Sequence, residues 1–150
     1  MLKAVRIAAI VIASLAAVLP WAVYWNELRN VDGRPAPPAG TKSAEAVDAF
    51  WTAHEPSLPP DKLADISPYW VYSFAGCIAG LYACDMKAPA GMSHMAEFVA
   101  LTYLRDGHFT GRKSLHWHMT AICLTIWIQR TMSPADLVGA YVEAETRYKP

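Results

Sequence analysis

The stretch IAAIVIASLAAVLPWAVYWN, residues 7–26, decides the architecture because it contains no charged residue. A helix needs about 20 mostly apolar residues to cross the hydrocarbon core of a bilayer. Lys3 and Arg6 come just before the stretch, which favours a cytoplasmic N-terminus. Aromatic residues at the other end are typical of the far membrane interface: Trp21, Tyr24 and Trp25. The sequence therefore predicts an N-terminal anchor, with the rest of the chain outside the cytoplasm.

A cleaved signal peptide is the alternative interpretation of the same stretch. The apolar core of a signal peptide usually has about 7–15 residues and ends at a site of small residues. This stretch is longer, and its end is aromatic. The pattern favours an anchor that stays attached.

Length and charge limit the kind of domain that the anchor can carry. The 150 residues leave room for one further domain of ordinary size. Lys and Arg together number 13, as do Asp and Glu, so the net charge is zero. A nucleic-acid-binding domain usually carries a basic excess, so nucleic acid is not expected as a partner.

We expect three parts along the chain: an anchor at 1–27, a linker at 28–42 and a helical domain at 43–150. The linker is rich in Pro and Gly, which favours extended chain. Five serines stand where helices would begin, and no strand pattern of comparable strength occurs, so the predicted fold class is all-α. The expected helix starts are Ser43, Ser67, Ser93, Ser114 and Ser133.

The helix expected from Ser114 to about Arg130 is apolar nearly all round, which predicts the buried centre of the domain. A second membrane span is the alternative. The uncharged part, residues 115–128, is shorter than a span needs and contains His116 and His118. A buried core helix is therefore favoured.

The three cysteines, Cys77, Cys84 and Cys123, would lie in an oxidising compartment, where one disulfide is possible. Cys77 and Cys84 are too far apart for a disulfide if they share one continuous helix. Three small buried apolar side chains are the favoured interpretation, and the disulfide question stays open.

Three segments resemble the peptidoglycan glycosyltransferase family 51, whose members polymerise lipid II. The segment IQRTMSPADLVGAYVE, residues 128–143, resembles the family stretch Leu-Glu-Arg-Arg-Leu-Ser-Lys-Asp-Glu-Ile-Leu-Glu-Leu-Tyr-Leu-Asn, and Arg130, Ser133, Leu137 and Tyr141 agree with it. The segment GMSHMAEFVALTYL, from Gly91, resembles the family's Gly-Gly-Ser-Thr-Ile-Thr-Gln-Gln stretch and keeps Ser93. A third piece, ISPYWV from Ile66, resembles the approach to the first catalytic glutamate.

The resemblance covers about residues 59–143 and implies a small helical domain like the core of that lysozyme-like fold, facing the periplasm from a bacterial inner membrane. The catalytic motifs differ. In the ungapped register the family's Glu-Asp-x-x-Phe motif falls on Ile78, Ala79 and Tyr82, and its Arg-Lys-x-x-Glu motif falls on Trp117, His118 and Ala121. The reaction implied by the resemblance needs a general base and cations for the departing pyrophosphate. Both glutamates are absent at these positions, and the segment between residues 82 and 91 is much shorter than in the family.

Other residues are weaker candidates for the same chemistry. Asp85 and Glu97 are the only acids between Asp65 and Asp106, so either is a candidate for a displaced base. Cations in the loop before the long helix, and one at its end, are candidates for holding a pyrophosphate or an anionic head group. With the serine kept from the family stretch, the candidate ligand-binding residues are Ser93, Arg105, Arg112, Lys113 and Arg130.

No metal or cofactor is expected. Four histidines raise the question of zinc: His94, His108, His116 and His118. Two residues apart on a helix, His116 and His118 point to different faces, so they do not form a ligand pair there. No Walker loop, G-x-S-x-G or H-E-x-x-H motif occurs.

These patterns are consistent with three hypotheses. The first is an anchored, non-catalytic domain that binds an undecaprenyl-linked cell-wall precursor or docks an envelope membrane protein on exposed aromatic residues such as Trp51, Trp70 and Trp117. The second is an active glycosyltransferase with a rearranged site. The third is an accessory subunit of a membrane complex. An acid buried in the cleft within reach of a sugar would count against the first.

Overall fold

The computed structural model describes residues 2–37, 43–78, 91–111 and 115–148, and within these ranges the chain is helical without a β-strand. Its elements are α1 (Leu2–Leu28), α2 (Ala44–His54), the 3-10 helix η1 (Pro60–Asp65), α3 (Trp70–Ile78), α4 (His94–Tyr103), the π-helical turn η2 (Leu104–His108), α5 (Leu115–Thr131) and α6 (Pro134–Tyr148). The predicted all-α class is confirmed for the part of the chain described.

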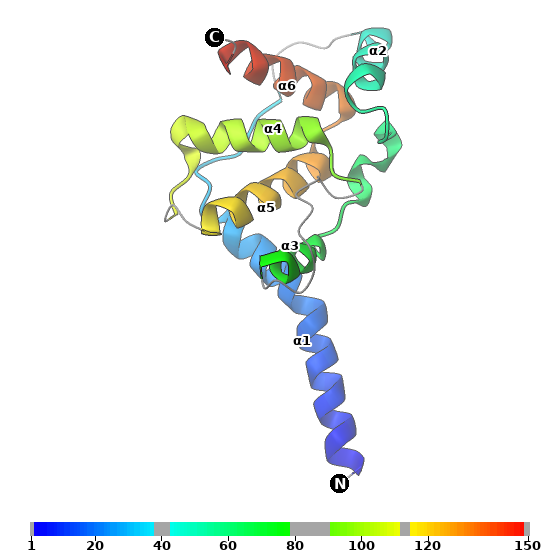
Figure 1. Ribbon diagram of the computed structural model, residues 1–150, viewed down its shortest axis with the longest axis vertical. Helices are drawn as coiled ribbons and strands as arrows, with labels where there is room; N and C mark the ends of the chain where they lie inside the picture. Colours follow the sequence, from blue (N-terminus) through cyan, green and yellow to red (C-terminus); the bar gives the residue numbers. More distant parts are fainter. Residues whose placement is uncertain (1, 38–42, 79–90, 112–114, 149–150) are drawn as a thin grey trace.

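The helices form a layered domain at one end of a long stalk (Figure 1). The first part of α1 extends away from the domain, and its last turns enter it and pack against α5. Helix α4 lies between α5 and α6, and α2 packs on α6. Helix α3 lies at the base of the domain, beside α1. The base is therefore the face from which the stalk leaves.

Serine caps fix three of the helix starts as the sequence predicts. The Ser43 and Ser93 hydroxyls accept hydrogen bonds from the backbone N–H groups of Ala46 and Ala96, at 3.3 Å and 3.1 Å. Ser133 and Asp136 bond reciprocally at the start of α6, as in a capping box. These predictions are confirmed. Ser114 lies outside the described residues.

Helix α5 forms the centre of the core, which confirms the prediction made from its apolar composition. Leu124, Ile126 and Ile128 have no exposed surface. Across from α5, Ala96 and Ala100 lie four residues apart on α4 and are also fully buried. Small side chains at a helix contact allow a short interaxial distance, so α4 can pack closely against its neighbours.

The end of α1 belongs to the core of the domain. Tyr24 is only 3% exposed and Leu28 1%, and Val31 just beyond the helix is also buried. Tyr24 therefore does not lie at the surface as one of the expected interfacial aromatics, whereas Trp21 and Trp25 are exposed. The reason is that the helix enters the domain before it ends.

The first part of the expected linker is packed as well. Arg34 donates to the carbonyl of Leu28 at 3.0 Å, which places a positive charge at the C-terminal end of α1. Val31 forms an isolated antiparallel bridge with Phe109, and the Tyr103 hydroxyl donates to the Asp32 carbonyl. Residues 28–35 of the expected linker are therefore tied to the domain. Residues 38–42 lie outside the described ranges.

One helix in the described residues, Lys3–Leu28, is long and apolar enough to cross a membrane. Most of its large apolar side chains up to Leu19 are exposed. The helix expected from Ser67 to Tyr82 is shorter where it is described: α3 begins at Trp70 after a turn at Ser67, and residues 79–90 are not described.

Candidate functional site

A buried polar cluster lies at the N-terminal end of α4, where the sequence predicts a ligand-binding serine. The Ser93 hydroxyl donates to Glu55 Oε1 at 2.7 Å, and the backbone N–H of Met95 donates to the same oxygen at 2.8 Å. Glu55 follows α2 and is only 8% exposed. Its negative charge at a helix N-terminus is favourable, because the free backbone N–H groups there are partly positive.

Gln129 of α5 completes this cluster. Its Oε1 accepts from the backbone N–H of Ser93 at 2.8 Å, and its Nε2 donates to the carbonyl oxygens of Gly91 at 3.0 Å and Leu63 at 3.3 Å. Gly91 has a φ of +90°, a conformation that a residue with a Cβ adopts only with strain. One amide therefore holds α5, η1 and the turn before α4 together.

Chemically, this cluster serves as a cap. Ser93 has no exposed surface, and its oxygen both donates to Glu55 and accepts from Ala96. The hydroxyl is therefore unavailable to a ligand in this structure, which corrects the expectation for Ser93. Glu55 is a buried acid that no sequence pattern singles out, and the two donors at its Oε1 are both internal.

A second buried acid, Glu27, lies in the last turn of α1 and is 5% exposed. Its Oε2 accepts from the Thr120 hydroxyl at 2.8 Å and from the Asn30 side-chain amide at 3.2 Å. The Nδ1 atom of His116 lies 3.2 Å from its Oε1. A buried carboxylate is stable when it is hydrogen-bonded in this way. Glu27 therefore ties the stalk to α5.

Neither buried acid lines the groove near the C-terminal end of α4. That groove has a volume of about 370 Å³ and lies between residues 35–37, α4 and α6. Asp106, Glu143 and Arg147 lie on its wall. Arg147 forms ion pairs with both acids, so its one positive charge offsets part of their two negative charges.

Arg130 lies at the base of the domain. Its guanidinium donates to the carbonyl of Ile66 at 2.9 Å and stands 5.7 Å from the centre of the Trp21 ring. The side chain remains exposed. Of the predicted cationic candidates, this one lies beside the stalk, where an anionic lipid head group would be found.

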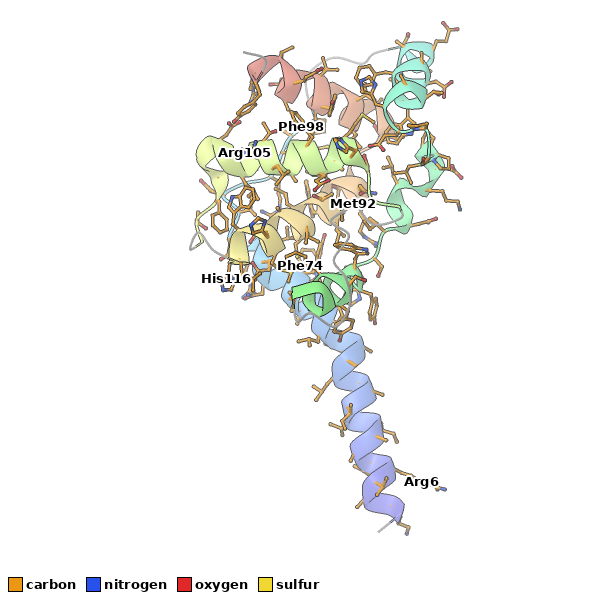
Figure 2. The ribbon with its side chains drawn as sticks, viewed as in Figure 1. Arg6, Phe74, Met92, Phe98, Arg105 and His116 are labelled. Carbon is orange, nitrogen blue, oxygen red and sulfur yellow. The ribbon has the colours of Figure 1, made fainter. Side chains whose placement is uncertain are left out.

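The remaining candidates are scattered. Arg105 is exposed in η2, at the opposite end of α4 from Met92 (Figure 2). Glu97 lies half-buried in the first turn of α4. Asp85, Arg112 and Lys113 lie outside the described residues. The predicted cationic residues that are described do not meet in one place.

The histidines weighed as metal ligands, and the tryptophans predicted as docking residues, have other surroundings. No group of three potential metal ligands occurs in the described part of the chain. Trp51 is only 2% exposed, and its indole N–H donates to the carbonyl of Leu58 at 2.7 Å. It is a core residue, so its prediction as an exposed docking residue is wrong. Trp70 and Trp117 are half-buried against the core.

Comparison of the chain with models of protein families, with characterised proteins and with solved structures gave no match.

Cys123 is a free, fully buried thiol in α5. Burial raises its pKa to about 12, and the nearby Glu27 carboxylate acts in the same direction. The thiol therefore stays protonated between pH 7 and 9, where the reactive thiolate is needed for alkylation. We expect peptide mapping after N-ethylmaleimide treatment to find Cys123 unmodified in the folded protein and fully modified in denaturant. Equal modification in both states would contradict its burial. Cys77 and Cys84 have no described side-chain positions.

Proposed function

We propose that the chain is a membrane-anchored protein that acts by binding and does not catalyse glycosyl transfer. Helix α1 is the anchor, and Lys3 and Arg6 keep its N-terminus in the cytoplasm, so that the helical domain faces the periplasm. The ligand is an undecaprenyl-linked cell-wall precursor. This choice rests on the resemblance of residues 128–143 and of the segment from Gly91 to the family 51 glycosyltransferases.

The observation that supports binding without catalysis is that both buried acids already accept hydrogen bonds from inside the domain. A general base must lie within hydrogen-bonding reach of the proton that it removes. Glu55 and Glu27 each accept internal hydrogen bonds and are less than a tenth exposed. Neither lines the groove beside α4 and α6. Each acid serves to hold helices together.

The position of Arg130 supports a ligand held at the membrane. A guanidinium presents donors that match phosphate oxygens, and the Trp21 ring holds this one at the side of the stalk. A pyrophosphate attached to a membrane-embedded lipid would reach this level of the protein. Arg130 would meet the pyrophosphate, while α1 and the base of the domain would lie along the lipid chain.

Binding of fluorescent lipid II to the protein in nanodiscs tests the proposal. We expect saturable binding that weakens about tenfold in Arg130→Gln, because a hydrogen bond to a charged group contributes about 1.5–3 kcal/mol. Lys62→Gln is the matched control, since Lys62 is an exposed cation paired with Asp65 on η1. Absence of binding, together with an envelope protein that co-purifies in mild detergent, would favour the accessory-subunit hypothesis instead.

A further inference from the structure

The part of α1 that is exposed on every side, before Pro20, is too short to cross a bilayer alone. Residues 7–19 are exposed and uncharged, and Pro20 is the first buried position. These 13 residues span about 20 Å at 1.5 Å per residue, whereas the hydrocarbon core is about 30 Å thick. If Lys3 and Arg6 extend back to the head groups, the span begins at Ala4 and reaches about 24 Å. The part of the hydrocarbon core that these residues do not span lies at the level where α1 enters the domain.

Helix α3 lies at that level. The Tyr69 hydroxyl donates to the carbonyl of Ala17 at 2.7 Å, and the Tyr72 hydroxyl donates to the carbonyl of Ala16. Both acceptors belong to the exposed part of α1, below Pro20. Figure 2 shows Phe74 of α3 beside the upper part of α1, with Arg6 near the free end.

Pro20 explains why the Ala16 carbonyl needs a donor from outside α1. In a regular α-helix the carbonyl of Ala16 accepts from the N–H group of residue 20, and proline has none. In water this carbonyl would be hydrated. In hydrocarbon an unpaired backbone carbonyl is costly, and a neighbouring helix must supply a donor. Tyr72 supplies it, so the contact between α1 and α3 has the form expected inside a membrane.

The composition of this region fits the same environment. The sequence carries no charged residue from Ile66 to Ile78, the end of the described part of α3. Tyr69 and Tyr72 are exposed although they contact α1, and Trp21 and Trp25 are exposed on α1 itself. Arg130, the charged side chain beside Trp21, can extend toward the head groups. The base thus presents apolar and aromatic surface continuous with the exposed face of α1.

We propose that the base of the domain, formed by α3 and the adjoining turns of α1, is inserted into the outer part of the bilayer and contacts lipid acyl chains. This inference rests on the membrane anchor of the proposed function. It adds how deeply the domain sits in the bilayer. The domain does not stand above the membrane on a free stalk. Arg130, the proposed ligand contact at the base, therefore lies at the level of the lipid head groups.

Spin labels on the full chain in nanodiscs test the insertion. Labels are introduced by Ala75→Cys on α3, Ile12→Cys on α1 and Ala53→Cys on α2, in a chain carrying Cys77→Ala and Cys84→Ala; the buried Cys123 stays. The readout is the accessibility of each label to oxygen relative to a water-soluble nickel chelate. We expect this ratio to be severalfold higher at residues 12 and 75 than at residue 53.

The outcomes separate the two proposals. A high ratio at residue 12 with a low ratio at residue 75 would overturn the insertion of α3 and leave the anchor in place. A low ratio at both would overturn the anchor and the insertion together.

A second measurement does not depend on labelling. Tyr72→Phe is expected to lower the melting temperature in nanodiscs by roughly 5 °C more than Tyr148→Phe, whose hydroxyl bonds Asp106 at the aqueous surface. Equal shifts in the two variants would mean that water hydrates the Ala16 carbonyl, and the insertion would be wrong.

Discussion

A chain shortened to residues 43–150 is expected to lose its cooperative fold, although it retains every helix after the anchor. The truncation removes Tyr24, Leu28 and Val31 from the core. Burial of an apolar side chain of this size contributes about 1.5–3 kcal/mol, so the three together contribute roughly 5–9 kcal/mol. The whole stability of a typical domain is about 5–15 kcal/mol. Thermal unfolding followed by circular dichroism should show no sharp transition.

The matched control is a chain of residues 20–150, which keeps the buried turns of α1 and removes the exposed stalk, including the Ala16 and Ala17 carbonyls that bond to Tyr72 and Tyr69. It also keeps the hydrogen bond between Glu27 and Thr120. We expect this chain, in mild detergent, to unfold in one transition. If residues 43–150 melted at the same temperature as residues 20–150, the end of α1 would not be part of the core.

Gln129→Leu is expected to be the most destabilising single substitution among the polar residues of α5. It leaves the N–H of Ser93 and the carbonyls of Gly91 and Leu63 without their partner in a buried place. Each unpaired buried group costs about 1–3 kcal/mol, so a loss of about 3–5 kcal/mol is expected. The midpoint of denaturant unfolding measures this loss.

Thr131→Val on the same helix is the control for this substitution. Its hydroxyl bonds the carbonyl of Trp127, but the residue is exposed and water can replace the bond. Its effect should stay within about 0.5 kcal/mol. A similar midpoint for Gln129→Leu and Thr131→Val would show that the polar cluster does not hold the fold.

The features that the sequence predicts correctly depend on neighbours in the chain. The caps at Ser43, Ser93 and Ser133 use donors or acceptors three residues away. The central position of α5 follows from its apolar composition alone. Both kinds of signal lie within one segment, so no knowledge of the tertiary arrangement is needed.

The features that the sequence does not predict are long-range. Glu55 is buried because Ser93, 38 residues later, bonds it, and Glu27 is buried by Thr120, 93 residues later. Nothing near either glutamate in the sequence marks it as buried. Tyr24 is similar: an aromatic residue at the end of an apolar helix is typical of a membrane interface, and only the packing of α5 against α1 places it in a core.

The candidate site is predicted less completely than the fold. Arg130 lies at the base of the domain beside Trp21, whereas Ser93 is enclosed and Arg105 is at the far end of α4. Composition and spacing identify residue types suited to a pyrophosphate. They do not indicate which of these residues are already used by internal hydrogen bonds, as Ser93 is by Glu55.

Incubation of the full chain in nanodiscs with labelled lipid II, followed by gel separation of the products, tests binding without catalysis most directly. We expect lipid II to be bound and recovered unchanged, because both buried glutamates are occupied by internal hydrogen bonds. Glycan chains that form with the natural chain and disappear in Glu55→Gln would contradict this expectation, since Glu55 would then be the base of an active glycosyltransferase.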